Sequence, residues 1–281
     1  MDLNADELKS IFDDAGIVKG DILYVASDVT RLMNSVRKRY GLKTSAEREL
    51  FLNMLVDALQ DVVSPLGTLL FPVFSWDFCK GELFDIKHTL GKVGAFHNWI
   101  LLNRSDFLRT AHPMYSFVVW GKDADMLLTM DNVDAFSADS PFGYLHKTKA
   151  KMLLIDVHLD QSFTFMHYIE EQLNVPYRYL KNFRSFYIDR EGEITERSYT
   201  MFVRDLAIEL KMHLPDYLMS DSGAMKEIQW MDVPFRILDF EKSYAVCKED
   251  FLHNQGKMCY DFHGYDWKLG ERQTHPNDLD N

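Results

Sequence analysis

Apolar residues follow two different spacings along the chain, and the change between them predicts alternating strands and helices. Compact apolar runs predict buried strands at residues 21–25, 68–74, 115–120, 152–157 and 233–238. Amphipathic stretches predict helices at residues 4–15, 47–63, 94–102, 123–130, 203–213 and 243–254. Strands that alternate with helices through residue 175 are typical of an α/β fold. We therefore expect a three-layer α/β/α arrangement around a central mixed sheet.

Local signals fix some of the helix boundaries. The segment Thr44-Ser-Ala-Glu47 has the form of a capping box, in which a hydroxyl and a carboxylate satisfy backbone N–H groups at a helix start. Asn4 is expected to cap the first helix, and Gly16 is expected to close it. Each of these signals predicts where a helix begins or ends rather than what the protein does.

The second half of the chain adds a hairpin to this alternation. Residues 185–189 and 194–202 read as strands, and the turn signal Arg190-Glu-Gly192 lies between them. No repeat or linker interrupts the sequence, so we expect one domain over residues 1–281. From about residue 264 the chain is polar, and we expect this tail to be loosely attached.

Composition limits the class of protein. Of the 281 residues 47% are hydrophobic and 14% aromatic, which is enough for a large core. No apolar run reaches the roughly 18 residues of a membrane span, and the acidic start lacks the pattern of a signal peptide. An odd number of widely spaced cysteines favours a reducing cytoplasm over a disulfide framework, and none has zinc-ligand spacing (Cys79, Cys247, Cys259). We expect no metal.

Net charge argues against one further class of protein, the general nucleic-acid binders. The formal net charge of −12 disfavours a general nucleic-acid binder, which would need a basic stripe. It would favour the approach of a cationic substrate. Many cytosolic enzymes are equally acidic, so net charge does not identify a substrate.

The strongest candidate for chemistry is Thr164-Phe-Met-His167-Tyr-Ile-Glu170-Glu171, which opens a helix directly after a predicted strand. His167 and Glu170 share one helix face, so the carboxylate can fix the tautomer of the imidazole and stabilise its cation. That is what a general base needs, and Glu171 is the alternative partner. The Thr164 hydroxyl lies one turn earlier, near the free N–H groups of the helix start, where an oxyanion could be held. A surface His-Glu pair without chemistry has the same spacing.

A second cluster accompanies this helix, and further motifs surround it. The cluster is Arg109-Thr-Ala-His112-Pro113-Met-Tyr-Ser116, followed by Ser140-Pro-Phe-Gly143. Three earlier motifs precede it in order: Gly20-Asp21-Ile-Leu-Tyr-Val-Ala-Ser27-Asp28, Gly67-Thr68-Leu-Leu-Phe-Pro72 and Thr89-Leu-Gly91-Lys92-Val-Gly94. The order and spacing resemble the aminoglycoside 3-N-acetyltransferase family of acyl-CoA-dependent N-acyltransferases. The resemblance runs from about residue 18 to residue 175.

The chain departs from the family's pattern at several positions. Ala26-Ser27-Asp28 stands where the family usually has His-Ser-Ser. Thr89-Leu-Gly91-Lys92-Val-Gly94 stands where it often has Thr-Pro-Ser-x-x-Gly. The segment between Pro72 and Thr89 is short and aromatic, as in family members that acylate amino sugars for surface polysaccharides.

The resemblance implies a direct acyl transfer from acyl-CoA, with an acetyl or a hydroxyacyl group, to the amine of an amino sugar. We expect a nucleotide-linked sugar for an O-antigen or capsule-type polysaccharide, with an aminoglycoside antibiotic as the alternative acceptor. His167 would be the general base, Glu170 its orienting partner, and Thr164 a contact to the thioester carbonyl or to the pantetheine arm. The family also makes a homodimer plausible.

The remaining site predictions follow the same resemblance. Residues expected to bind acyl-CoA are Ser27 and Asp28 beyond the first strand, and Thr89, Gly91, Lys92 and Gly94 at a helix opening that could hold phosphates. Residues expected near the acceptor are Trp76, Asp77, Arg109 and His112. Ordinary packing, turns or helix starts explain each of these positions as well.

Two other classes of function stay open. A metal-dependent hydrolase would use His112, His158 and His167 with a carboxylate. A non-catalytic member of the same fold would bind acyl-CoA or a protein partner, and Ala26 in place of the family's histidine leaves room for that class.

Overall fold

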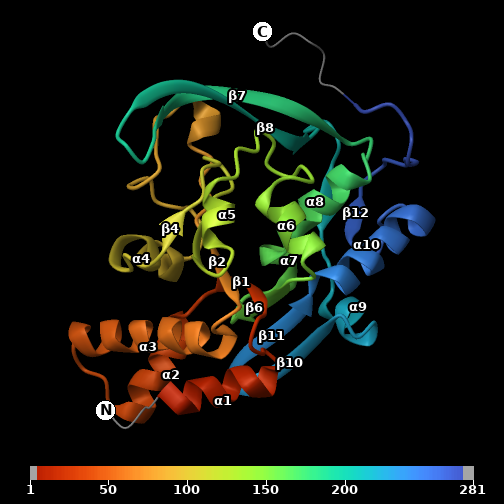
Figure 1. Ribbon diagram of the computed structural model, residues 1–281. Helices are drawn as coiled ribbons and strands as arrows, with labels where there is room; N and C mark the ends of the chain where they lie inside the picture. Colours follow the sequence, from red (N-terminus) through yellow and green to blue (C-terminus); the bar gives the residue numbers. More distant parts are fainter. Residues whose placement is uncertain (1–4, 275–281) are drawn as a thin grey trace.

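The computed structural model describes residues 5–274 and is built around a seven-stranded sheet (Figure 1). The strand order is β10-β11-β6-β1-β2-β5-β4. The strands are β1 (Ile22–Ser27), β2 (Thr68–Pro72), β4 (Leu108–Arg109), β5 (Phe117–Gly121), β6 (Lys151–Ile155), β10 (Met225–Trp230) and β11 (Val233–Asp239). β1 is parallel to both β2 and β6, and the outer pairs are antiparallel. The predicted central mixed sheet is confirmed.

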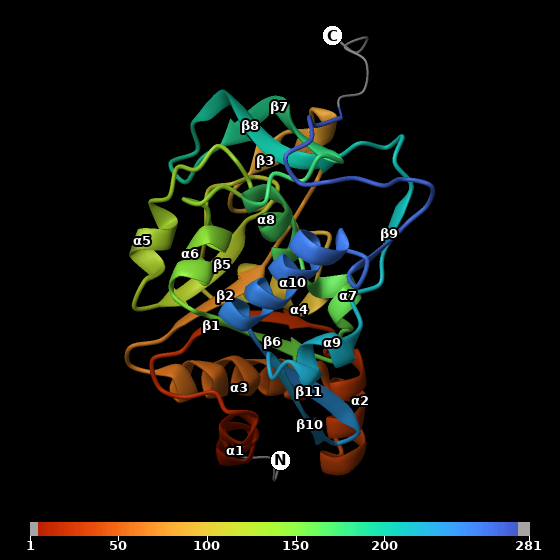
Figure 2. The same cartoon turned by 90° about the vertical axis from the view of Figure 1, so that its right-hand side faces the viewer.

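Helices cover both faces of this sheet (Figures 1 and 2). On one face lie α1 (Ala5–Ala15), α2 (Thr30–Tyr40), α3 (Ser45–Val63) and α4 (Ala95–Asn103), and on the other lie α6 (Pro141–Lys147), α8 (Phe165–Gln172) and α10 (Phe240–Asn254). Successive side chains of a strand point to opposite faces. Leu23 and Val25 accordingly join one buried cluster, and Tyr24 and Ala26 join the other. The three-layer prediction is confirmed.

The local helix signals also have structural outcomes. The Thr44 hydroxyl accepts a hydrogen bond from the Glu47 N–H at 3.2 Å, and the Glu47 carboxylate accepts one from the Thr44 N–H at 2.8 Å. The predicted capping box is therefore confirmed. Gly16 has φ +89° directly after α1, as a closing glycine should. The expected cap Asn4 lies outside the described residues.

A long hairpin, β7 (Arg178–Ile188) and β8 (Ile194–Arg204), arches above the α8 side of the sheet (Figure 1). Ile188 pairs with Ile194 at the turn, and β3 (Phe84–Asp85) lies parallel to β7. The hairpin prediction is confirmed, although β7 begins seven residues earlier than residue 185. Residues of this hairpin line one cavity of the candidate active site.

The predicted helix at residues 203–213 is wrong. These residues form the end of β8, a turn and β9 (Leu210–Met212), which pairs with β12 (Tyr260–Phe262). Val203 pairs with Tyr179 across the hairpin. Pairing with a neighbouring strand decides the conformation here, because local apolar spacing is a weak signal beside tertiary context.

The expected loose tail is attached to the body as far as residue 274. The Trp267 side chain is 2% exposed, and its ring lies 5.3 Å from the ring of Tyr177. The Thr274 N–H donates to the Pro176 carbonyl at 2.8 Å. Aromatic burial therefore outweighs the polar composition of this segment. Residues 275–281 of the expected tail lie outside the described residues.

Several short elements connect these layers. They are the 3₁₀ turn η1 (Phe78–Lys80) and the helices α5 (Ala124–Leu128), α7 (Leu159–Ser162) and α9 (Asp216–Asp221). Among residues 5–274, no helix is both long and apolar enough to cross a membrane.

Candidate active site

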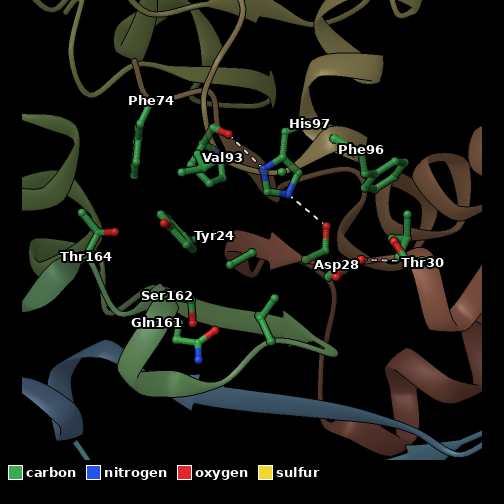
Figure 3. A pocket seen from close by; sticks show the side chains of 17 residues that line it. Tyr24, Asp28, Thr30, Phe74, Val93, Phe96, His97, Gln161, Ser162 and Thr164 are labelled. Atoms are coloured by element: carbon green, nitrogen blue, oxygen red, sulfur yellow. Dashed lines mark hydrogen bonds between the residues drawn. The ribbon is translucent and has the colours of Figure 1, made fainter. Parts of the chain in front are cut away.

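A cavity of about 440 Å³ opens at the carboxyl ends of β1 and β2 (Figure 3). Parallel strands place their carboxyl ends together, and α/β proteins commonly bind ligands there. The lining residues come from the end of β1, the end of β2, the start of α4 and the segment before α8: Tyr24, Ala26, Ser27, Asp28, Val29, Thr30, Pro72, Phe74, Val93, Gly94, Ala95, Phe96, His97, Val157, Gln161, Ser162 and Thr164. We refer to this space as the β1 cavity.

A second cavity of about 340 Å³ lies beneath the hairpin and is called the hairpin cavity below. His167, Tyr115 and Phe136 line it together with residues of β7, β8 and the turn after β8: Arg178, Tyr179, Lys181, Phe183, Met201, Phe202, Val203, Arg204 and Leu206. Phe74 of the β1 cavity and Tyr115 of the hairpin cavity have ring centroids 4.9 Å apart. The two cavities are therefore neighbours.

The start of α8 contributes to both cavities. Thr164 lines the β1 cavity, and His167 lines the hairpin cavity. The Thr164 carbonyl accepts a hydrogen bond from the His167 N–H at 3.0 Å, so the two residues are one turn apart. The start of α8 is therefore part of the wall of both cavities.

His167 is held by a buried carboxylate, as the sequence predicted. Its Nδ1 lies 2.8 Å from Glu170 Oε2, and the Glu170 side chain is 0% exposed. Tyr177 donates its hydroxyl to Glu170 Oε1 at 2.9 Å, and the Arg178 guanidinium forms an ion pair with Glu170 at 2.9 Å. Both oxygens of the carboxylate are therefore occupied, which fixes its position.

Charge in this cluster favours a neutral imidazole next to an ionised carboxylate. Burial alone would raise the pKa of Glu170, but Arg178 and His167 outweigh it and lower that pKa to about 2. Burial and the charge of Arg178 lower the pKa of His167, against the opposing effect of Glu170. Because a carboxylate only accepts, Nδ1 of neutral His167 carries the proton and Nε2 keeps its lone pair. The arrangement can therefore act as an oriented base.

Glu171, the alternative partner for His167, has different surroundings. Burial raises the pKa of its carboxyl to about 8, and the neighbouring Asp134 adds to that rise. Glu171 is thus next to another acidic group rather than beside the imidazole. The structure assigns the pairing to Glu170.

Thr164 differs in part from the sequence prediction. Its N–H is not free, because it donates to the Ser162 carbonyl at 2.8 Å. Its side chain and that of Tyr24 are neighbours in the lining of the β1 cavity (Figure 3). The donor that Thr164 can offer a ligand is therefore a side-chain hydroxyl and not a backbone amide.

The predicted acyl-CoA contacts divide into two groups. Ser27, Asp28 and Gly94 line the β1 cavity, as expected. Thr89, Gly91 and Lys92 do not line it.

Each of these three has another role. The Thr89 hydroxyl accepts from the Asp85 N–H at 2.8 Å, and the Gly91 backbone exchanges two hydrogen bonds of 2.8 Å with Asn98. Lys92 forms an ion pair with Asp77 at 2.7 Å. These contacts hold the turn before α4, and the predicted phosphate contacts of Thr89, Gly91 and Lys92 stay predictions.

None of the four predicted acceptor contacts lines either cavity. Trp76 donates its indole N–H to the Tyr115 hydroxyl at 3.1 Å. Asp77 is paired with Lys80 and Lys92. Trp76 therefore supports the wall of the hairpin cavity through Tyr115, and Asp77 anchors two lysines rather than a substrate ammonium.

Arg109 and His112 are buried in the protein framework. The Arg109 guanidinium donates to the Ser116 hydroxyl and the Val73 carbonyl, each at 2.8 Å. His112 is 2% exposed, and its Nδ1 accepts from the Tyr115 N–H at 3.2 Å. Burial and these partners account for both residues as packing elements, and their predicted contact with the substrate stays a prediction.

The three histidines of the hydrolase alternative do not form a ligand set. Across residues 5–274, no group of three His, Cys, Asp or Glu side chains is arranged to hold a metal ion. His112 is enclosed in the framework, and His158 is an exposed residue before α7.

Sequence reasoning missed His97. Its ring lines the β1 cavity, with Nε2 3.0 Å from the Ser27 hydroxyl and Nδ1 2.9 Å from the Pro72 carbonyl oxygen. Gly94 makes room for it: a Cβ at Gly94, whose φ is +67°, would lie 2.4 Å from His97 Nδ1. A histidine three residues after a glycine at a helix start was the available signal.

Comparison with known proteins places the chain in a family. The model of the aminoglycoside 3-N-acetyltransferase family matches residues 41–251. The SPbeta prophage-derived aminoglycoside N(3')-acetyltransferase-like protein YokD of Bacillus subtilis (strain 168) is 26% identical over 155 residues. That match covers 46% of this chain and 54% of YokD, so the chain spans about half the length of this curated relative.

Solved structures have the same fold. AAC-IIIb in a binary complex with CoASH matches with a TM-score of 0.69 and 18% identity, over 88% of this chain and 96% of that one. The crystal structure of YokD from Bacillus subtilis matches at 0.68 and 20%, over 90% and 94%. AAC-VIa bound to sisomicin matches at 0.65 and 19%, over 91% and 99%. From the extent of the family match, the chain belongs to the aminoglycoside 3-N-acetyltransferase family of acyl-CoA-dependent N-acyltransferases.

Proposed function

We propose that this enzyme transfers an acyl group from acyl-CoA directly to an amine, with His167 as the general base. The observation that carries the proposal is the position of α8, whose first turn lines the β1 cavity with Thr164 and the hairpin cavity with His167. Acyl-CoA would occupy the β1 cavity and the acceptor the hairpin cavity. Positioning two substrates in this way supplies much of the rate of an acyl transfer.

Bound acyl-CoA supplies a thioester carbonyl that is already reactive toward amines. His167 accepts a proton from the acceptor nitrogen at Nε2 as the new C–N bond forms and the C–S bond breaks. Glu170 stabilises the resulting imidazolium through Nδ1, at 2.8 Å. The proton then leaves His167 for the departing sulfur, which restores the neutral imidazole and gives an amide and free CoA.

The shape and lining of the β1 cavity fit a pantetheine arm. Aromatic and aliphatic walls come from Tyr24, Phe74 and Val93, while Ser27 and Thr164 add hydroxyl groups. A ligand that is largely aliphatic with a few amide groups matches a mixed lining of this kind. The proposed acyl group is acetyl or a longer hydroxyacyl chain.

The two candidate acceptors, an aminoglycoside and a nucleotide-linked amino sugar, belong to different chemical classes. The comparisons support an aminoglycoside, because related structures contain sisomicin or apramycin. The lining of the hairpin cavity favours a nucleotide-linked amino sugar, because it includes Lys181 and Arg204, in addition to the Arg178 that is paired with Glu170, and no aspartate or glutamate. A basic lining favours an acceptor that carries phosphate and disfavours a polycation.

The test is release of free thiol from acetyl-CoA, with one panel of nucleotide-linked amino sugars and one of aminoglycosides. Turnover with aminoglycosides alone would support the antibiotic acceptor. Turnover with nucleotide sugars alone would support the surface-polysaccharide role, and 3-hydroxyacyl-CoA would then be compared with acetyl-CoA. Absence of turnover with both panels and both acyl donors would contradict the proposed function.

A further inference from the structure

The β1 cavity contains an imidazole that the proposed transfer does not use. His97 is 2% exposed, and its ring packs against Phe71 and Phe96 with centroid distances of 5.7 and 6.3 Å. Both ring nitrogens have partners: Nε2 lies 3.0 Å from the Ser27 hydroxyl, and Nδ1 lies 2.9 Å from the Pro72 carbonyl oxygen. The dashed lines from His97 in Figure 3 mark these contacts.

These partners fix the tautomer of His97. A carbonyl oxygen only accepts hydrogen bonds, so Nδ1 carries the proton and Nε2 keeps its lone pair. The Ser27 hydroxyl must then donate its single proton to Nε2. Burial lowers the pKa of His97 to about 4, against a smaller opposing effect of the Pro72 carbonyl, so the ring stays neutral near pH 7.

The tautomer of His97 determines which hydrogen bonds the Ser27 oxygen can make with a ligand in the cavity. Ser27 is the last residue of β1 and lines the cavity, and with its proton committed to His97 the oxygen can only accept. A hydroxyl normally offers both a donor and acceptors, so this restriction selects a ligand group with an N–H or O–H. The donors of the pantetheine arm of coenzyme A are two amide N–H groups and one hydroxyl, whereas the phosphates near pH 7 are acceptors.

We propose that His97 is a positioning residue that commits the Ser27 proton, so that the Ser27 oxygen accepts an amide N–H of the pantetheine arm. This inference rests on the proposed function, because it takes acyl-CoA as the occupant of the β1 cavity. It assigns a role to His97, which reaches the end of β1 from α4.

A serine beside a histidine is also the arrangement of an activated nucleophile, but its surroundings favour binding. An acyl-serine step would need donors for an oxyanion. Two of the three backbone N–H groups that follow Ser27 are used within the protein: that of Asp28 donates to the Ile155 carbonyl at 2.9 Å, and that of Thr30 donates to the Asp28 carboxylate at 2.9 Å. A histidine with a strongly lowered pKa is also a weak base.

The experiment is calorimetric titration of the full chain with acetyl-CoA and two analogues, in each of which an ester oxygen replaces one pantetheine N–H. Loss of one neutral hydrogen bond weakens binding roughly three- to tenfold. The wild-type protein should show that loss for one of the two analogues. Ser27→Ala should bind acetyl-CoA three- to tenfold more weakly and should no longer distinguish that analogue. If Ser27→Ala kept the wild-type preference for the amide, the inference would be overturned.

Two variants test the role of His97, and an exposed serine provides the control. His97→Phe removes the acceptor and should weaken acetyl-CoA binding about as much as Ser27→Ala. His97→Gln retains an acceptor oxygen and a donor N–H and should bind within about twofold of wild type. Equal acetyl-CoA affinity of wild type, His97→Phe and His97→Gln would contradict the positioning role. An equal loss of affinity in the two variants would also contradict it. Ser220→Ala, an exposed position on α9, should bind like wild type.

Failure of the inference and failure of the proposed function give different results. If the wild-type chain binds no acyl-CoA, the proposed function fails and the inference fails with it. If the wild-type chain binds and turns over acetyl-CoA while neither analogue loses affinity, only the inference fails. Circular dichroism and thermal melting of each variant establish that a loss of affinity is not a loss of fold.

Discussion

Nδ1 of His167 lies 2.8 Å from Glu170, whose carboxylate also lies 2.9 Å from the Arg178 guanidinium. One buried carboxylate therefore serves an imidazole and a permanent cation. Arg178 keeps Glu170 ionised, and ionised Glu170 holds the proton of His167 on Nδ1. This relationship ties the protonation of the candidate base to the hairpin, because Arg178 is the first residue of β7.

Replacing His167 by alanine should reduce kcat roughly a hundred- to ten-thousand-fold, as expected for loss of a general base. Acetyl-CoA affinity should change little, because His167 lines the hairpin cavity and not the β1 cavity. Steady-state kinetics and calorimetry measure the two effects. His253→Ala is the matched control, since that side chain is 73% exposed on α10. A folded His167→Ala variant that retains more than a third of wild-type activity would remove His167 from this role.

Glu170→Gln should reduce kcat less than His167→Ala, because the imidazole remains and only its orientation and cation are less well supported. The larger effect should be on stability. Loss of one partner of a buried ion pair costs about 3 kcal/mol or more of unfolding free energy, since Arg178 is left without its counterion.

The pH dependence of the unfolding free energy follows from the lowered pKa of Glu170. Its value of about 2 in the folded state lies below the ordinary value of 4.5. The contribution of the carboxylate to stability is therefore present above pH 4.5 and is lost as the pH falls toward 2. The gap in unfolding free energy between wild type and Glu170→Gln should shrink over that interval, as measured by urea denaturation. A constant gap from pH 7 to pH 3 would refute the assignment.

The sequence predicted the layers and the His167–Glu170 pair for a physical reason. Both rest on local periodicity: residues three apart meet on a helix, and buried strands read as apolar runs. The position of Arg178 beside Glu170 was not predictable in this way, because the hairpin brings it back over α8. His97 and Ser27 are 70 residues apart, and only the sheet topology brings them together.

Other predicted site residues have protein partners that the sequence did not indicate, for a similar reason. Lys92 follows Gly91 at a helix opening and has the sequence signature of a phosphate contact, yet the nearby Asp77 takes its ammonium group. Arg109 reads as a ligand contact, yet three acceptors of the framework use its donors. Side-chain partners of this kind depend on loop geometry, which residue spacing does not specify.

Glu171→Gln should stabilise the protein, and more so as the pH rises. The pKa of Glu171 in the folded state, about 8, lies above its ordinary value of 4.5, so folding favours the protonated form. The loss of stability caused by the Glu171 carboxyl begins above pH 4.5, where it ionises in the unfolded chain, and grows until about pH 8. The side chain is partly exposed, so we expect a gain on the order of 1 kcal/mol at pH 8 and little at pH 4.5.

Urea denaturation of wild type and Glu171→Gln at pH 5 and pH 8 measures this gain. Glu249→Gln on the exposed face of α10, where the carboxylate is 68% exposed, is the matched control and should show no comparable trend. An equal difference at both pH values would mean that Glu171 is not held in its protonated form.

Gly94→Ala should harm both stability and acyl-CoA binding, and Gly41→Ala separates the two causes. The two glycines have φ of +67° and +69°, so an alanine at either position is strained by about 1 kcal/mol. A Cβ at Gly41 meets nothing within 4 Å, whereas one at Gly94 would lie 2.4 Å from His97 Nδ1 and push the ring away from Ser27. Thermal melting should therefore show a larger loss for Gly94→Ala than for Gly41→Ala. Only Gly94→Ala should weaken acetyl-CoA binding in calorimetry, and equal behaviour of the two variants would show that His97 tolerates the displacement.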